Sequence, residues 1–209
     1  MNVNDMYRIC QFAVNKAQNG YLTPSEFNLI INQAQVSYQD YLLGEFQQYQ
    51  YGRPQARINY SQNENIRQRL SPLITEATLT INGTSGEAPY PADYVQADAI
   101  RTTTFDRVRY AQQDSLYSYY NSQIDPIATN PIYLLEPTGF QFYPKTLGSA
   151  ILTYIKDAPS IVWAYTTVAG RSVYAPTQTG VGVTPTTGTV QPVWDNVDLL
   201  EIIARGLKL

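Results

Sequence analysis

Helical periodicity marks both ends of the chain, and an alternating pattern marks its middle. The best-defined helix starts at Thr23, whose hydroxyl is spaced to form a capping box with the Glu26 carboxylate, with Pro24 at the first helical position. The apolar residues that follow share one helical face and predict a long helix that ends before Gly52-Arg53-Pro54; they are Phe27, Ile30, Ile31, Ala34, Tyr38, Tyr41 and Leu42.

Two shorter helices are expected around this one. Asn4 or Asp5 is expected to cap the first, which ends at Asn19-Gly20 and carries Met6, Ile9, Cys10, Ala13 and Ala17 on one face. The short turn between the first two helices predicts an antiparallel helical hairpin. Residues 62–70 favour a third helix that stops before Ser71-Pro72.

The period changes at Ala77, where ATLTIN (77–82) alternates and is rich in β-branched residues, which is typical of a strand. Further strands are expected near residues 94–104, 132–135, 139–143 and 150–155, with a helix over 111–123. The segment 177–192 is rich in Thr, Gly and Pro and has little to bury, so it is expected to be a mobile loop or hairpin.

The chain returns to a helical pattern at Trp194, with Asp195 as the expected cap. Asp198, Glu201, Arg205 and Lys208 form a narrow polar stripe, while apolar residues cover the rest of this helix. A helix that is apolar over most of its circumference has to be enclosed by other elements, and the N-terminal hairpin is the expected partner. The helix reaches Leu209 without a stop signal, so it is expected to continue.

These patterns predict an α+β fold with two parts. Residues 1–76 and 193–209 are expected to form a helical bundle from the N-terminal hairpin and the C-terminal helix. Residues 77–192 are expected to form a β-rich, antiparallel, sandwich-like middle domain with a flexible loop at 177–192.

Residue composition argues against an enzyme. The 209 residues include no His and a single Cys, which removes the commonest general base, the Ser-His-Asp and Cys-His arrangements, and a zinc site. The glycines at 180, 182 and 188 lack the Lys-Ser/Thr of a phosphate loop. The carboxylate pairs Asp93 with Asp98 and Asp195 with Asp198 are better explained by turns and a helix start. We therefore expect no catalytic residue, no cofactor and no metal.

Charge and hydropathy narrow the expected partners. A net charge of −3 without a basic run argues against electrostatic binding of nucleic acid. No apolar run is long enough for a membrane span, and residues 1–20 do not read as a signal peptide. Charged residues make up only 15% of the chain and 18 residues are Tyr, which favours a surface covered by protein partners, although a compositional habit of the genome is the plainer explanation.

The ordered set of motifs resembles the head-to-tail connector (adaptor, or ring) proteins of tailed bacteriophages. The likeness is strongest to ring proteins of crAss-like phages that infect gut Bacteroidetes, and more distant to the tail tubular adaptor of short-tailed phages. It rests on LTPSEFN (22–28), ATLTIN (77–82), YPADY (90–94), FQFYPKTLGSAILTYIKDAP (140–159) and WDNVDLLEIIARGLKL (194–209).

This resemblance implies a structural subunit of a ring, typically of twelve copies, that joins the portal protein to the next tail ring or tail protein. DNA would pass through its channel without specific binding, and the protein would be made in the host cytoplasm and end in the neck or tail of the virion. The candidate contacts with the portal or neighbouring copies are Arg205, Leu207, Leu209, Gly180, Val181, Gly182 and Val183.

An alternative function is a carbohydrate- or receptor-binding module of the tail or virion surface. Aromatic side chains bind sugars through their faces, and Trp163 and Tyr165 lie in the β-rich middle. Aromatic residues in strands more often pack in a core or against another subunit, which favours the connector.

Overall fold

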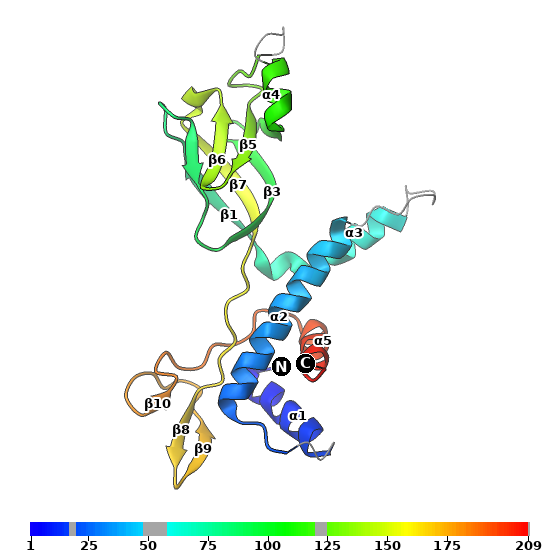
Figure 1. The fold of residues 1–209 in the computed structure, drawn as a ribbon, viewed down its shortest axis with the longest axis vertical. Helices are drawn as coiled ribbons and strands as arrows, with labels where there is room; N and C mark the ends of the chain where they lie inside the picture. The colour runs from blue at the N-terminus through cyan, green and yellow to red at the C-terminus, as the bar shows by residue number, and fades with distance from the viewer. Residues whose placement is uncertain (17–19, 48–57, 120–124, 209) are drawn as a thin grey trace. The chain divides into compact units, whose positions relative to one another are not determined.

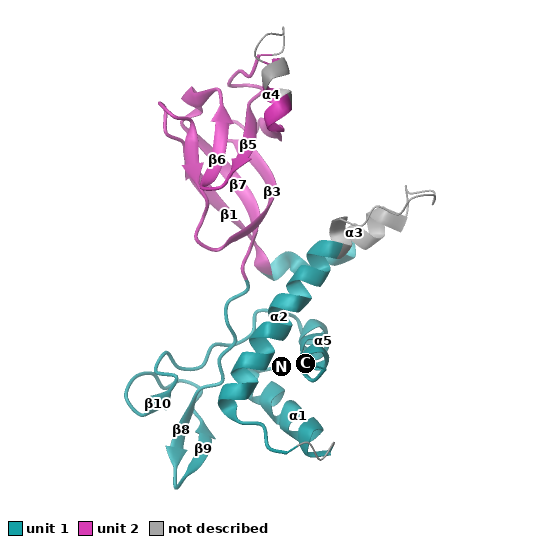
Figure 2. Ribbon diagram, viewed as in Figure 1, with its two compact units in different colours: residues 1–72, 158–209 teal, residues 73–157 magenta. Residues whose placement is uncertain are grey.

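The computed structural model describes residues 1–16, 20–47, 58–119 and 125–208. It is a mixed α and β structure that divides into two compact units, residues 1–72 with 158–209 and residues 73–157 (Figure 2). This division differs from the expected one, because residues 158–192 belong with the helices. The first unit contains α1 (Val3–Lys16), α2 (Pro24–Gln47), α3 (Ile58–Leu70) and α5 (Asn196–Gly206).

The start of α2 confirms the capping box. The Thr23 N–H donates to Glu26 Oε2 at 2.8 Å, and the Glu26 N–H approaches the Thr23 hydroxyl at 3.4 Å. The Thr23 hydroxyl also donates to Glu26 Oε2 at 2.7 Å, and this bond, followed by that from the Thr23 N–H, lowers the pKa of the Glu26 carboxyl. The expected cap of α1 is wrong: Asn2 takes that place, with the Asp5 N–H donating to Asn2 Oδ1 at 2.9 Å. The Asn2 N–H in turn donates to Asp5 Oδ2 at 3.3 Å, so Asn2 and Asp5 form the same reciprocal pair as Thr23 and Glu26.

The helices of the first unit meet around the apolar face of α2. Tyr7 of α1 packs edge-on against Phe27 of α2, with their ring centroids 5.2 Å apart. The methyl of Ile30 lies 3.1 Å from where a Cβ on Gly206 would be, so α5 approaches α2 closely at a residue without a side chain. The fully or nearly fully buried apolar residues of these helices include Val3, Met6, Tyr7, Cys10, Phe27, Ile31, Ala34, Tyr38, Leu42, Leu70, Leu199, Ile202 and Ile203.

The extended segment 158–163, which follows the second unit along the chain, is held by side-chain amides of α2. Asn28 donates to the Trp163 carbonyl at 3.2 Å and accepts from the Trp163 N–H at 2.8 Å. Asn32 does the same for Ile161, at 2.8 and 2.7 Å. The amides thus replace the backbone of a neighbouring strand, and residues spaced by four along α2 meet residues spaced by two along the segment.

Gln35 is the third side-chain amide of α2 that bonds to this segment, and we call Asn28, Asn32 and Gln35 the amide ladder. Unlike the two asparagines, Gln35 only donates to the segment. Its Nε2 donates to the carbonyls of Ala158 and Pro159, at 3.3 and 3.1 Å. Its buried Oε1 has no hydrogen-bond partner among the described residues. Pro159 has no N–H to donate, so the reciprocal bond made at Ile161 and Trp163 is not available from it.

A three-stranded sheet follows this segment, in the order β10-β8-β9, with β8 (Tyr165–Val168), β9 (Arg171–Tyr174) and β10 (Val183–Thr184). Figure 1 shows these strands on one side of α2, whereas α1 and α5 lie on its other side. The Thr189 hydroxyl accepts from the Ala164 N–H at 3.2 Å and donates to the Ala175 carbonyl at 2.9 Å. Val190 exchanges two backbone hydrogen bonds with Val162.

These contacts correct the expectation for residues 177–192. Contacts within the same unit order this segment. Val183 packs with Ala164 and Ala175, and the backbone of Val183 and Thr184 pairs with β8. Gly188 has φ +78°, and a Cβ there would lie 2.8 Å from the Gln178 carbonyl oxygen. Glycine at this position therefore lets the loop close on itself, and composition alone does not reveal that closure.

The second unit is one seven-stranded sheet with the order β1-β7-β3-β4-β5-β6-β2. All neighbouring pairs are antiparallel except β4 with β5, which is parallel. One curled sheet thus stands in place of two facing sheets. Its strands are β1 (Ile74–Thr80), β2 (Glu87–Pro89), β3 (Tyr94–Thr102), β4 (Arg107–Tyr110), β5 (Ile132–Glu136), β6 (Gly139–Tyr143) and β7 (Ser149–Lys156), with α4 (Gln113–Tyr119) after β4.

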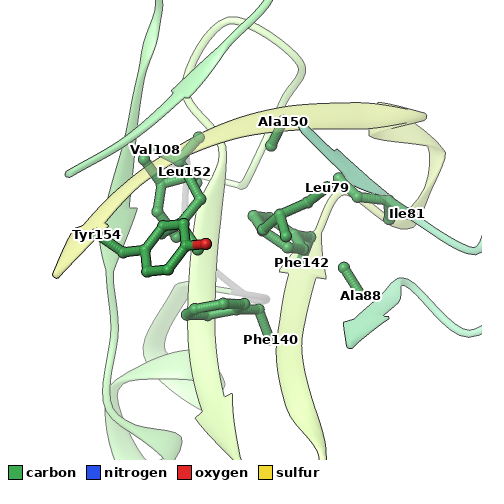
Figure 3. Close-up of a cluster of buried hydrophobic side chains, with 10 residues drawn as sticks. Leu79, Ile81, Ala88, Val108, Phe140, Phe142, Ala150, Leu152 and Tyr154 are labelled. Carbon is green, nitrogen blue, oxygen red and sulfur yellow. The ribbon is translucent and has the colours of Figure 1, made fainter. Parts of the chain in front are cut away.

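Residues from both ends of the strand order share the core of this unit, which is why the sheet curls. Leu79 of β1 and Ala88 of β2 lie in the same cluster as Phe140 and Phe142 of β6 and Leu152 of β7 (Figure 3). In β7, burial alternates strictly from Ser149 to Tyr154, as expected for a strand with one face inward. The turn Asn82–Gly86 brings β1 and β2 together, with the Asn82 N–H bonded to the Glu87 carbonyl at 2.9 Å.

The amide ladder predicts that a single substitution in α2 lowers the free energy of unfolding. Replacing Asn32 with Ala leaves the N–H and carbonyl of Ile161 without their partner, which should cost about 2 kcal/mol in the free energy of unfolding measured by urea denaturation. Gln33, the next residue, is exposed and serves as the control. Its replacement with Ala should stay within about 0.5 kcal/mol. Equal losses for the two variants would contradict the ladder.

Candidate interaction surface

The two long faces of α5 differ in exposure, and the outward face combines apolar residues with the charged residues Glu201 and Lys208. Leu199, Ile202 and Ile203 are buried. On the opposite face Val197 is 69% exposed, Leu200 56% and Leu207 42%, and Ala204 is also exposed. A helix on the surface of a monomer normally turns polar residues outward, so this outer row is the strongest candidate contact surface of the first unit.

The expected polar stripe of α5 is wrong at Asp198. This residue is buried, and its carboxylate accepts from the Tyr38 hydroxyl at 2.6 Å. Arg69 of α3 reaches the same carboxylate at 3.7 Å and donates to the Tyr38 hydroxyl at 3.3 Å. Asp198 thus ties α5 to α2 and α3, a role that spacing along one helix cannot reveal. A buried carboxylate needs such partners because burial without them is costly.

Arg205, a predicted contact residue, is engaged within its own chain. Its guanidinium pairs with Glu201 at 3.1 Å, one helical turn away. It also lies 4.3 Å from the ring centroid of Tyr41 and 5.5 Å from that of Tyr38. These contacts hold the side chain along α2, where it covers aromatic surface.

Leu207 borders an apolar pocket of about 160 Å³ between α1, α2 and α5. The pocket walls carry no charged side chain. Burial raises the pKa of the Cys10 thiol in this wall to about 11. The other lining residues are Val14, Leu22, Phe27, Ile30, Ile31, Ile203 and Gly206. Leu209, predicted together with Leu207, lies outside the described residues.

The second group of predicted contact residues, 180–183, leads into β10, and its two valines differ in exposure. Val181 is fully exposed between Gly180 and Gly182, whose φ angles are +97° and +89°. Val183 instead points inward and is 5% exposed. The structure therefore leaves Val181 accessible and removes Val183 as a contact residue, and it brings neither next to Leu207 in a single site.

Trp163, the main residue of the carbohydrate alternative, is part of the interior. It is 3% exposed and its ring lies 4.3 Å from that of Tyr7. Its indole N–H donates to Asn4 Oδ1 at 3.2 Å. Tyr165 and Tyr174 stack against it at 5.8 and 5.7 Å, so these rings pack on one another. The aromatic group is a structural cluster rather than an open platform.

The described ranges of the chain offer neither a metal site nor a membrane-spanning helix. No group of three or more His, Cys, Asp and Glu side chains there is placed to hold a metal ion. In the same ranges, no helix combines the length and the apolar character needed to cross a membrane.

Comparison with known proteins adds no family to these observations. Neither protein-family models nor curated proteins give a match to the chain.

The buried hydroxyl of Tyr38 predicts how the free energy of unfolding depends on pH. Burial and the bond to Asp198 raise the pKa of its hydroxyl from 10.0 to about 12. Because the folded pKa is the higher one, the Tyr38 hydroxyl contributes its full stability below pH 10, and this contribution is lost as the pH rises toward 12. Tyr38→Phe should lower the free energy of unfolding by about 2 kcal/mol at neutral pH.

The measurement is urea denaturation of both proteins at pH values from 7 to 11. The gap between wild type and Tyr38→Phe should narrow above pH 10, while other tyrosines affect both proteins alike. A gap that stays constant over this range would show that the hydroxyl is not held in its protonated form by the fold.

Proposed function

We propose that this protein is a structural subunit of a connector ring that joins the portal to the tail of a tailed bacteriophage. The observation that carries the proposal is the row of exposed apolar side chains on α5, Val197, Leu200, Ala204 and Leu207, on a helix whose inner face is apolar except for Asp198. A row of this kind needs a covering partner, and the order of motifs along the chain supports a ring as that partner.

In this proposal the contacting helices α1, α2 and α5 form the bundle of the subunit, and the curled sheet of residues 73–157 is its second part. Copies of the chain, typically twelve, meet through heterologous contacts that close into a ring. The portal protein and the next tail ring or tail protein cover the remaining faces. The role is structural and involves no catalysis.

The DNA that leaves the capsid would pass through the ring without being held. The net charge of −3 supports this part of the proposal, because a channel wall that neutralises phosphates would retain the DNA. The virion neck or tail is the place of action that follows from such a role.

The alternative, a carbohydrate- or receptor-binding module, has weaker support. Its principal aromatic residue, Trp163, is packed between Tyr7, Tyr165 and Tyr174. A sugar-binding platform requires an accessible aromatic face, and burial removes that face from Trp163.

Electron microscopy of the purified protein, alone and mixed with its portal, tests the proposal. Rings on the portal, with the rotational symmetry of the subunit copies, are the expected result. A protein that remains monomeric beside its portal and binds glycans on an array would overturn the connector and favour the alternative. A monomer without portal is compatible with the proposal, since similar adaptors assemble on the portal.

Two aspartate substitutions on α5 separate folding from assembly. Ile203→Asp introduces a charge into the core and should cost about 4 kcal/mol in the free energy of unfolding. Leu200→Asp, three residues earlier on the exposed face, should change stability by less than about 1 kcal/mol but prevent ring formation. Thermal melts and microscopy measure the two effects. Normal rings from folded Leu200→Asp would place the contact elsewhere.

A further inference from the structure

We propose that the free edge of β1 in the second unit takes up an extended segment of a partner protein that carries basic side chains. The segment would add an antiparallel strand to the sheet. Two features carry this inference: a row of backbone groups along β1 that face away from the sheet, and carboxylates around the end of that row. The inference goes beyond the proposed connector, because it concerns one unit and holds whether or not a ring forms.

Alternate residues of β1 turn their backbone N–H and carbonyl groups away from the sheet. The Ile81 N–H donates to the Gly148 carbonyl at 2.9 Å, which fixes the residues that bond to β7. In an antiparallel pair every second residue bonds to the neighbouring strand, so the odd-numbered residues of β1 face β7. The backbone groups of Glu76, Thr78 and Thr80 therefore point the other way, where none of the described strands follows β1 in the sheet order.

Pro89 explains why β2 does not cover this edge. The Asn82 N–H bonds to the Glu87 carbonyl at 2.9 Å, where the turn between the two strands begins to close. Continuing this antiparallel register would place Thr80 opposite Pro89, two residues further along each strand. Proline has no N–H to donate to the Thr80 carbonyl, so the ladder between β1 and β2 ends before Thr80. The edge is open from Thr80 back to Glu76.

β1 also differs from the other edge strands among the described residues. It has seven residues, whereas β2, β9 and β10 have three, four and two. Natural edge strands commonly carry a proline, a lysine or a bulge that hinders the addition of another strand. β1 has neither proline nor lysine, its register with β7 is unbroken, and its single charged residue, Glu76, pairs with Arg101 at 3.5 Å. β1 is therefore the edge best suited to accept a strand.

Two carboxylates lie around the end of this edge. Glu87 and Glu136 line an open hollow of about 510 Å³ together with Thr80, and none of its described lining residues is basic. A strand added along β1 would reach this hollow at its Thr80 end, so a Lys or Arg side chain there would lie close to both carboxylates. The other lining residues are Asn82, Ala88, Pro89, Thr138, Gly139 and Phe140.

These charges favour a basic segment over a second copy of β1. If two β1 strands paired antiparallel in the register centred on Thr78, Glu76 of one copy would lie at the Thr80 end of the other, toward Glu87 and Glu136. Like charges in such positions repel. A segment with basic side chains is attracted by the same carboxylates, and it also faces Glu76 across the two strands. The partner that fits this edge is therefore a basic, extended peptide segment.

Binding of a designed peptide to the full-length protein tests this inference. The probe is a synthetic peptide of four valine-lysine repeats, whose lysines would lie on the outer face of the sheet beside Glu76 and Thr78. We expect saturable binding in calorimetry, with half-saturation below about 1 mM, and backbone NMR shifts centred on residues 76–80. The same peptide with glutamate in place of lysine is the charge control and should not bind.

Variants separate backbone pairing from the attraction between charges. Thr78→Pro removes an N–H that points away from β7, so circular dichroism should show an unchanged fold, and binding should weaken about tenfold or more. Thr78→Val keeps this N–H and is the matched control, which should bind as wild type does. Glu87→Gln combined with Glu136→Gln should weaken binding about fivefold at low salt.

A modified peptide tests the backbone pairing without any change to the protein. In antiparallel pairing, the lysines that face Glu76 and Thr78 also direct their backbone N–H groups toward β1. N-methyl groups on these lysine backbone nitrogens should therefore abolish binding to the wild-type protein. The same groups on the valine nitrogens point away from β1 and should leave binding intact.

Several outcomes would overturn the strand-accepting edge. These are no binding of the lysine peptide, equal binding of the glutamate peptide, unweakened binding to folded Thr78→Pro, and shifts that lie away from β1. A dimer in sedimentation that Thr78→Pro abolishes would show that β1 pairs with itself, against the basic segment. None of these outcomes bears on the connector, whose test is ring formation on the portal.

Discussion

The first unit depends on the amide ladder by which α2 holds the extended segment 158–163. Backbone groups in an extended chain require partners, and here Asn28 and Asn32 supply both a donor and an acceptor to single residues of the segment. The ladder thereby places Trp163 against Tyr7 and starts β8 beside α2. The ladder thus fixes the path of the chain where it enters the first unit from the second.

The residues of α2 serve several neighbours at once because each occupies a different sector of the helix. One sector carries the amides, a second carries Phe27 and Tyr38 toward α1 and α5, and a third leaves Leu29 and Val36 exposed. The sharply defined start at Thr23 matters for this reason: a shift of one residue would rotate each sector by about 100° away from its neighbour. The capping box thus fixes the rotational register of the helix.

Local patterns in the sequence predicted much of the fold and little of the surface. The Thr23–Glu26 spacing was sufficient to place the start of α2, and local patterns placed β1, β3, β5, β6 and β7, because capping and strand burial are encoded within a few residues. The short strands β2 and β4 were not predicted. Asp198 was misassigned as exposed, since its partners Tyr38 and Arg69 are far away in the sequence. Residues 158–192 were misassigned because their order comes from amides and hydroxyls rather than from an apolar period.

The candidate contact residues differ in accessibility, which local sequence patterns do not encode. Leu207 and Val181 are accessible, whereas Val183 is buried and Arg205 lies along Tyr41. The signal that sequence reading missed was Asn28, Asn32 and Gln35 at intervals of four and three, which puts three amides on one helical face.

Amide hydrogen exchange of Ile161 and Trp163 tests the central role of the ladder most directly. Both N–H groups donate to side-chain oxygens of α2, at 2.7 and 2.8 Å, although neither residue belongs to a helix or a strand. The account predicts that they exchange as slowly as the buried amides of α2 and only when the first unit unfolds. Exchange at the rate of exposed loop amides would show that the segment is not held by the ladder and would contradict the account.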